Sequence, residues 1–257
     1  MSTIIGRCTL CIVSAALVAL TILCLVHQAA AFPLPERLEF KLSYSGITAG
    51  RAVQEVKQAT NGIHVVSTAK SADWLRFFFP VDDRIESHLT LGTPPQYLGY
   101  PFLYTERKSE GRSRTDRETS FDHTKLEATT TDHRNKGVKK QPITTRTYDT
   151  LSSFYYFRTV PLQVGTSYFI EIFDGKKLWN TEVKVLRREE LVTSLGRFNT
   201  IVIHPLLKFE GIFARTGDMF IWLTDDERRI PVQMKSKVVV GSITATLTGG
   251  SYWPAGK

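Results

Sequence analysis

The sequence predicts an all-β protein, built as a strongly curved antiparallel sheet or an open β-barrel with one or two short aromatic helices. Apolar and polar residues alternate along most of the chain beyond residue 32, which is the period of half-buried strands. These short segments are separated by turns that contain Gly, Asn and Asp. Two aromatic segments break the alternation. A closed barrel and a two-sheet sandwich remain alternatives, because alternation does not distinguish them.

Residues 1–31 are predicted to be an export signal peptide that is cleaved after Ala31. A start with one cation, Arg7, precedes an uncharged run over residues 8–26, and three small residues end at Ala31. This is the pattern of a signal and its cleavage site. An uncleaved anchor is the alternative, because the run approaches the roughly 20 apolar residues that span a bilayer. We therefore expect residues 32–257 to be a single β-rich periplasmic domain, either free or membrane-associated.

Composition limits the kinds of catalytic site, metal site and partner that the predicted exported part can have. All three cysteines, Cys8, Cys11 and Cys24, lie in the predicted signal, so thiol catalysis and Cys-based metal sites are excluded beyond it. The net charge is +8, and its densest stretch, residues 134–140, suits either a solvated loop or contact with anionic envelope polymers. Nucleic acid is not an expected partner of an exported chain.

The strands are predicted in order from the alternation. The first covers 38–44, and the others are 51–58, 63–70, 84–91, 97–108, 112–121, 126–131, 167–173, 178–188, 198–203, 219–224, 231–240 and 242–252. The chain shows no linker that would demand two domains, and its weakest join is the stretch 135–146, rich in Lys, Thr and Gly.

Two hairpins are predicted with their register. A four-residue loop from Asp174 to Lys177 pairs Phe173 with Leu178, so that apolar residues face each other. A two-residue turn at Gly241-Ser242 pairs Val240 with Ile243, Val238 with Ala245 and Ser236 with Leu247, which places apolar residues on one buried face.

Two helices are predicted where the alternation fails. One covers 72–79 and ends at Pro80. The other follows Asp149, a suitable N-cap residue, and continues to Phe157 with apolar residues at helical spacing. Both are short and aromatic, and we expect them to lie against the sheet or to close its open end.

The sequence shows no catalytic motif. The histidines beyond the signal are scattered, with no H-x-H or H-x-x-x-H pair (His64, His88, His123, His133 and His204). There is no G-x-S-x-G nucleophile elbow. The acidic doublets at 82–83 and 225–226 point to opposite sides of a strand, so neither is a glycosidase pair by itself. We predict no catalytic residue, no metal ligand and no cofactor.

Several motifs together resemble one exported bacterial family. They are WLTDD at 222–226, RRIPV at 228–232, VGSI at 240–243 with Leu247, LSSFYYFR at 151–158 with Val164-Gly165, and YSGITAG at 44–50. The chain is similar here to the domain-of-unknown-function family numbered 3108, over essentially all of its exported part. The resemblance implies a periplasmic or envelope-associated β-rich domain of a Gram-negative bacterium, and it brings no activity and no site residues.

The predicted function is therefore non-catalytic. We expect an envelope protein that binds an amphiphile, such as a lipid or an acyl chain, in its curved sheet, with peripheral membrane contact as a further expectation. The candidate ligand-binding residues are aromatic and come from the two helical segments: Trp74, Phe77, Phe78, Phe154 and Tyr155. The alternatives are a hydrolase of envelope polymers and a structural partner of another envelope protein.

Overall fold

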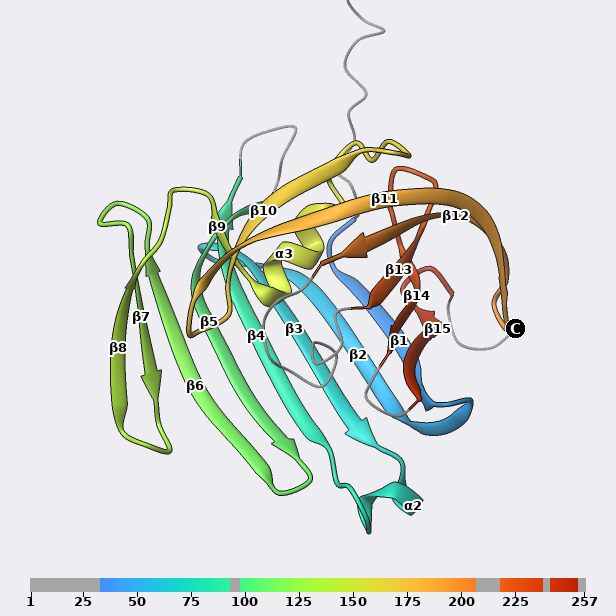
Figure 1. Cartoon of the computed structure of the whole chain (residues 1–257), viewed down its shortest axis with the longest axis horizontal. Helices are drawn as coiled ribbons and strands as arrows, with labels where there is room; N and C mark the ends of the chain where they lie inside the picture. The colour runs from blue at the N-terminus through green and yellow to red at the C-terminus, as the bar shows by residue number, and fades with distance from the viewer. Residues whose placement is uncertain (1–32, 93–97, 207–217, 238–240, 254–257) are drawn as a thin grey trace, which may run out of the picture. The chain divides into compact units, whose positions relative to one another are not determined.

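One sheet of fifteen strands dominates the protein (Figure 1). The structure is a computed structural model that describes residues 33–92, 98–206, 218–237 and 241–253. The predicted signal peptide lies outside the described residues. No described helix is long and apolar enough to cross a membrane.

In the described part of the chain, the strands follow one another with two short helices between them. They are β1 (Glu36–Tyr44), β2 (Ile47–Ala59), β3 (Gly62–Ser71), α2 (Asp73–Arg76), β4 (Asp82–Leu91), β5 (Leu98–Glu110), β6 (Ser113–Asp122), β7 (Glu127–Asp132), β8 (Gly137–Pro142), β9 (Thr147–Asp149), α3 (Thr150–Phe157), β10 (Ser167–Phe173), β11 (Leu178–Thr193), β12 (Gly196–Pro205), β13 (Met219–Thr224), β14 (Pro231–Lys237) and β15 (Ser242–Gly250).

The sheet is open, and its two ends are β8 and β9. Its order is β8-β7-β6-β5-β4-β3-β2-β1-β15-β14-β13-β12-β11-β10-β9, so the first and last of the described strands are neighbours. Neighbouring strands are antiparallel except β9 and β10, which are parallel. The sheet curls around α3 (Figure 1), and irregularities such as the one between Val185 and Arg187 in β11 help it to bend. This confirms the predicted open, strongly curved sheet.

Helix α3 lies inside the curve and joins the two largest parts of the core. Leu151 and Tyr155 pack with residues of β2 to β7, and Phe157 packs with residues of β10 to β13. The Asp149 carboxylate accepts hydrogen bonds from the backbone N–H groups of Leu151 and Ser152, and the Ser152 hydroxyl accepts from the Asp149 N–H. The predicted cap is confirmed as a capping box.

The first predicted hairpin is confirmed. Phe173 pairs with Leu178, and Ile172 pairs with Trp179. The Asp174 carboxylate accepts the backbone N–H groups of Lys176 and Lys177. The aspartate thus closes the four-residue loop, as Asp commonly does in turns.

The register of the C-terminal hairpin was wrongly predicted. Ser236 pairs with Ile243 instead of Leu247, and Ala245 pairs with Met234. The connection is therefore longer than two residues, and predicted pairs that involve residues 238–240 lie outside the described residues. The faces are nevertheless correct, because the error is four residues and strand faces repeat every two. Ala245 is buried as expected.

The segment 135–146, the weakest join in the sequence, contributes the edge strand β8 over Gly137–Pro142, which was not among the predicted strands. Its side chains are mostly exposed, so it carries no apolar alternation that would indicate a strand. Lysines on an edge strand discourage pairing with other chains.

Candidate functional site

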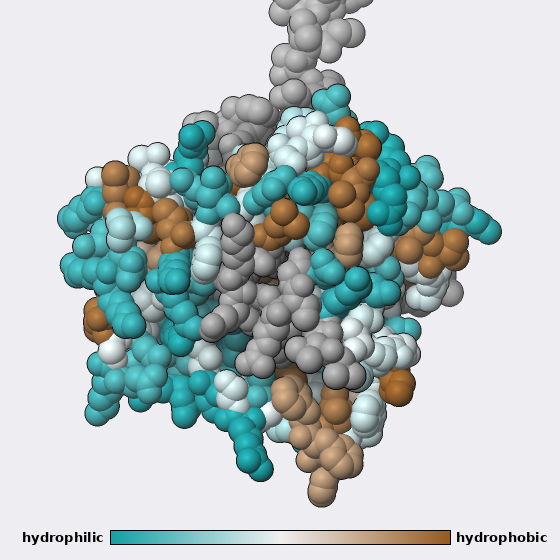
Figure 2. All heavy atoms as spheres, viewed as in Figure 1, coloured by the Kyte–Doolittle hydropathy of each residue, from teal (hydrophilic) through white to brown (hydrophobic). Residues whose placement is uncertain are grey.

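The turn between β3 and β4 exposes a cluster of large aromatic side chains. Trp74, Phe77, Phe78 and Phe79, which we call the aromatic tip, follow one another at and just after α2. Phe77 is 92% exposed and Phe78 is 79% exposed, and α2 buries none of its residues. Figure 2 shows an apolar protrusion at the end of the molecule where Figure 1 places α2. Isolated apolar residues on a surface are ordinary, whereas a contiguous exposed group indicates contact with another apolar body.

The aromatic tip is braced by the start of β2 and by the β5–β6 turn. The Trp74 indole N–H donates to the carbonyl of Thr48 over 2.9 Å. The ring of Phe79 lies so close to Gly111, in the β5–β6 turn, that a Cβ there would be 2.6 Å from it. The Gly111 N–H also donates to the Pro80 carbonyl. These contacts hold the turn, so that Phe77 and Phe78 project from a fixed base.

Cations lie on α2 and in or next to the β5–β6 turn. Arg76, Arg112 and Arg114 are exposed, and Arg114 donates to the Gly111 carbonyl that lies beside the tip. An open cleft of about 430 Å³ at the base of α2 is lined by Arg51, by Lys70 with its ion-pair partner Asp82, and by Arg76 with its ion-pair partner Asp73. A group of arginines and lysines next to exposed aromatics is suited to anionic phosphate beside apolar chains.

The second predicted segment lies in the core instead. Tyr155 is fully buried, and its hydroxyl lies 3.4 Å from the Gln54 side chain. Burial raises the pKa of this phenol well above its usual range. Phe154 is partly buried and packs against both large core clusters. Both side chains therefore contribute first to the packing of α3 against the sheet.

The structure does not bring the two aromatic segments together. Trp74 bonds to Thr48 and Tyr155 to Gln54, and both partners belong to β2. Six residues of extended strand separate these partners by about 20 Å. Of the predicted site residues, Trp74, Phe77 and Phe78 therefore share one exposed surface, while Phe154 and Tyr155 lie inside the curve.

A second open cleft, also about 430 Å³, lies beside β9 and β10. Tyr100, Tyr148 and Tyr156 line it together with Arg146, and Glu171 is the one carboxylate among the described lining residues. In the cleft at α2, the carboxylates of Asp73 and Asp82 are exposed and ion-paired. Neither cleft offers the pair of carboxylates, one of them in apolar surroundings, that glycoside hydrolysis requires.

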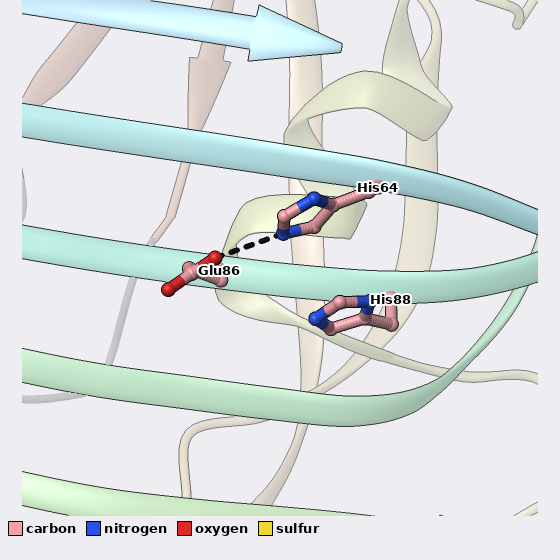
Figure 3. Close-up of side chains that lie close together, drawn as sticks. All are labelled: His64, Glu86 and His88. Atoms are coloured by element: carbon pink, nitrogen blue, oxygen red, sulfur yellow. Dashed lines mark hydrogen bonds and ion pairs between the residues drawn. The ribbon is translucent and has the colours of Figure 1, made fainter. Parts of the chain in front are cut away.

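Sequence reasoning missed a polar cluster on β3 and β4. His64 and His88 are direct cross-strand partners, and Glu86 lies two residues before His88 on the same face (Figure 3). One ligand atom from each of the three side chains lies within 4.8 Å of the others. The spacing Glu-x-His was visible in the sequence, but the contribution of His64 depends on the pairing of two strands.

The comparisons with known proteins concern the fold and the family. A family model described as "Protein of unknown function (DUF3108)" matches residues 39–248. Among solved structures, the chain is similar to a β-barrel-like protein of domain of unknown function DUF1849 from Brucella abortus. The TM-score is 0.52 at 11% identity, over 84% of this chain and 96% of that chain. At this identity the similarity shows the fold alone. No curated protein matches the chain.

Proposed function

Because the chain belongs to the DUF3108 family, whose function is unknown, we propose a function from its own surface: it is a non-catalytic, exported envelope protein that binds anionic lipid bilayers through its aromatic tip. The proposal keeps the predicted amphiphilic ligand and moves its binding site. The ligand is a bilayer surface met by Trp74, Phe77 and Phe78, rather than a single acyl chain held around α3.

The exposure of Phe77 and Phe78 carries the proposal. Removing a phenylalanine side chain from water is worth roughly 1.5–3 kcal/mol. Two nearly fully exposed rings therefore contribute roughly 3–6 kcal/mol when they enter an apolar phase. Their base is already braced by Trp74 and Phe79, so little conformational entropy is lost on insertion.

Trp74 and the arginines support a bilayer as the apolar phase. Tryptophan prefers the interface between hydrocarbon and water, and the half-exposed ring of Trp74 lies beside the projecting phenylalanines. Arg112 and Arg114 are exposed in and next to the β5–β6 turn that contacts Phe79, and exposed Arg76 of α2 pairs with Asp73; all three are available to lipid phosphates. Each such cation contributes about 1 kcal/mol near an anionic membrane surface.

Vesicle co-sedimentation tests the proposal. The protein is purified from cells that express the full chain, and its binding is compared on vesicles of phosphatidylglycerol with phosphatidylethanolamine and on vesicles of phosphatidylcholine. We expect preference for the anionic vesicles, and we expect Phe77→Ser/Phe78→Ser to weaken binding at least about 100-fold, because 1.4 kcal/mol is tenfold in affinity.

Phe169→Ser is the matched control. Phe169 is 65% exposed but lies on β10, away from the tip, so this variant should bind as the wild type does. All variants share the same N-terminus, and their differences therefore isolate the tip from any contribution of residues 1–31. Equal binding by the double variant and the wild type, or no binding by the wild type, contradicts the proposal and favours a protein partner for the tip.

A further inference from the structure

We propose that His64, Glu86 and His88 form a binding site for one divalent transition-metal ion, for which zinc is the probe. The site lies on the outer face of the sheet, away from α3. The residues that alternate with them face inward: Val65 and Leu89 join the core cluster that contains α3, and Ser87 donates to Asp149. The site is therefore separate from the core and from the aromatic tip.

Strand pairing gives the three side chains a common direction. His64 and His88 are opposite each other on β3 and β4, and Glu86 precedes His88 by one strand repeat. The side chains of His64 and Glu86 are only 12% and 17% exposed. Because the side chains stand on paired strands, their backbone positions are fixed before any ion binds.

One pair of ligand atoms is already at a distance compatible with ligation, and the third lies within 4.8 Å of both. Zinc binds imidazole nitrogen at about 2.0–2.1 Å in a tetrahedron, so its ligand atoms lie about 3.3 Å apart. His64 Nε2 is already 2.9 Å from Glu86 Oε2. The rings of His64 and His88 are stacked, with centroids 4.1 Å apart and planes at 10°. Because imidazole donates in the plane of its ring, binding of both histidines to one ion requires the His88 ring to rotate out of this stack, and the χ2 torsion of histidine is broad enough to permit rotation.

Arg84 orients the carboxylate. Its Nε donates to Glu86 Oε1 over 2.8 Å, and its Nη2 donates to Oε2 over 3.0 Å. Hydrogen bonds of this kind hold ligating carboxylates in position in metal sites. When Glu86 Oε2 binds the ion, the hydrogen bond from Arg84 Nε to Glu86 Oε1 is retained. The Arg84 guanidinium also partly neutralises the negative charge of Glu86, so we expect moderate rather than very tight affinity for the ion.

The ligand set selects the class of ion. Two imidazoles with one carboxylate suit zinc, copper or nickel, whereas magnesium and calcium prefer sites made of oxygen ligands. Three protein ligands leave a fourth position for water. The proposal departs from the sequence-based prediction of no metal ligand.

Zinc titration by calorimetry tests the site, with protein purified from cells that express the full chain and treated with a chelator. We expect one zinc ion per chain for the wild type, and at least about tenfold weaker binding for His64→Gln and His88→Gln. His133→Gln is the matched control, because His133 is exposed in the β7–β8 turn and should leave binding unchanged. Circular dichroism verifies that each variant is folded.

X-ray absorption at the zinc edge gives a readout that folding does not change. The wild type should show two imidazole ligands, and His88→Gln one. Absence of zinc binding by the folded wild type overturns the proposal, as does wild-type affinity in both folded His64→Gln and His88→Gln. Equal loss of affinity in His133→Gln also overturns it, because the ion would then bind elsewhere.

Discussion

Replacement of Arg158 by methionine is expected to destabilise the fold by about 3–5 kcal/mol, because it leaves a buried carboxylate without its partner. Arg158 directly follows α3, and its side chain is 0% exposed. Its two terminal nitrogens bond the Glu36 carboxylate over 2.5 and 2.7 Å. Tyr252 donates to the same carboxylate, so the pair connects α3 to the first strand and to the C-terminal region.

The buried guanidinium also satisfies backbone groups. Its Nε and Nη2 donate to the carbonyls of Arg229 and Arg228, both over 3.1 Å. Arg158→Lys should therefore not restore stability, because an ammonium group does not reproduce the planar fork of an arginine. The double variant Glu36→Leu/Arg158→Met should recover part of the loss, since it removes both buried charges but leaves the carbonyls of Arg228 and Arg229 without the guanidinium donor.

Urea unfolding followed by tryptophan fluorescence measures these differences in the free energy of unfolding. If Arg158→Met lowered the free energy of unfolding by less than about 1 kcal/mol, the reasoning would be refuted, because an ion pair on the surface already contributes up to that much. A double variant that is as unstable as the sum of the two single variants would also refute it, since the cycle would then show no coupling.

Three further variants probe other parts of the structure. Gly241→Val should destabilise the fold by more than about 1 kcal/mol, because Gly241 has φ +84° and an added Cβ would lie 2.2 Å from Ser45 Oγ; urea unfolding tests this. Asp149→Ala should cost about 1–2 kcal/mol through loss of the α3 cap, measured by the same assay. Burial and the Asp83 carboxylate raise the pKa of Glu110 to about 7 from 4.5. The folded chain thus holds a proton that the unfolded chain releases, and stability falls as pH rises from about 4.5 to 7. Glu110→Gln should raise the Tm at pH 8 and leave it nearly unchanged at pH 4, below both pKa values.

The fold class was predictable because alternation records which face of each strand is buried. Alternation repeats every two residues, so it fits equally well when one strand is shifted by two or four residues against its partner. For this reason Ser236 was predicted to pair with Leu247, whereas it pairs with Ile243. The hairpin at Asp174 was predicted correctly because its loop contains a residue that closes the turn with its own side chain. The Asp174 side chain therefore fixed the hairpin register that periodicity alone did not determine.

Two of the family motifs have a physical explanation in the structure. LSSFYYFR supplies the Ser152 of the capping box and ends in Arg158, the buried cation. RRIPV supplies the carbonyls of Arg228 and Arg229 that Arg158 binds. This connection spans about 70 residues and was not visible in either motif alone.

The site was predictable only in part. The sequence identified both aromatic segments, but composition does not show whether an aromatic side chain lies inside or outside a curved sheet. Tyr155 follows a capping box and enters the core, whereas Phe77 lies beyond a four-residue helix that buries nothing. The histidine cluster required the pairing of β3 with β4, which places His64 opposite His88.

Quenching of tryptophan fluorescence by brominated lipids tests the central claim most directly. Trp74 lies in the aromatic tip, while Trp179, Trp222 and Trp253 lie on other strands or turns and serve as internal references. An aromatic surface that lies in the interface is buried about 5–10 Å into the boundary between headgroups and acyl chains. On anionic vesicles, we expect quenching by lipids brominated high on the acyl chain, and loss of this quenching in Trp74→Phe, which still binds through Phe77 and Phe78. Unquenched wild-type fluorescence on vesicles that bind the protein, or equal quenching in Trp74→Phe, would contradict insertion of the aromatic tip.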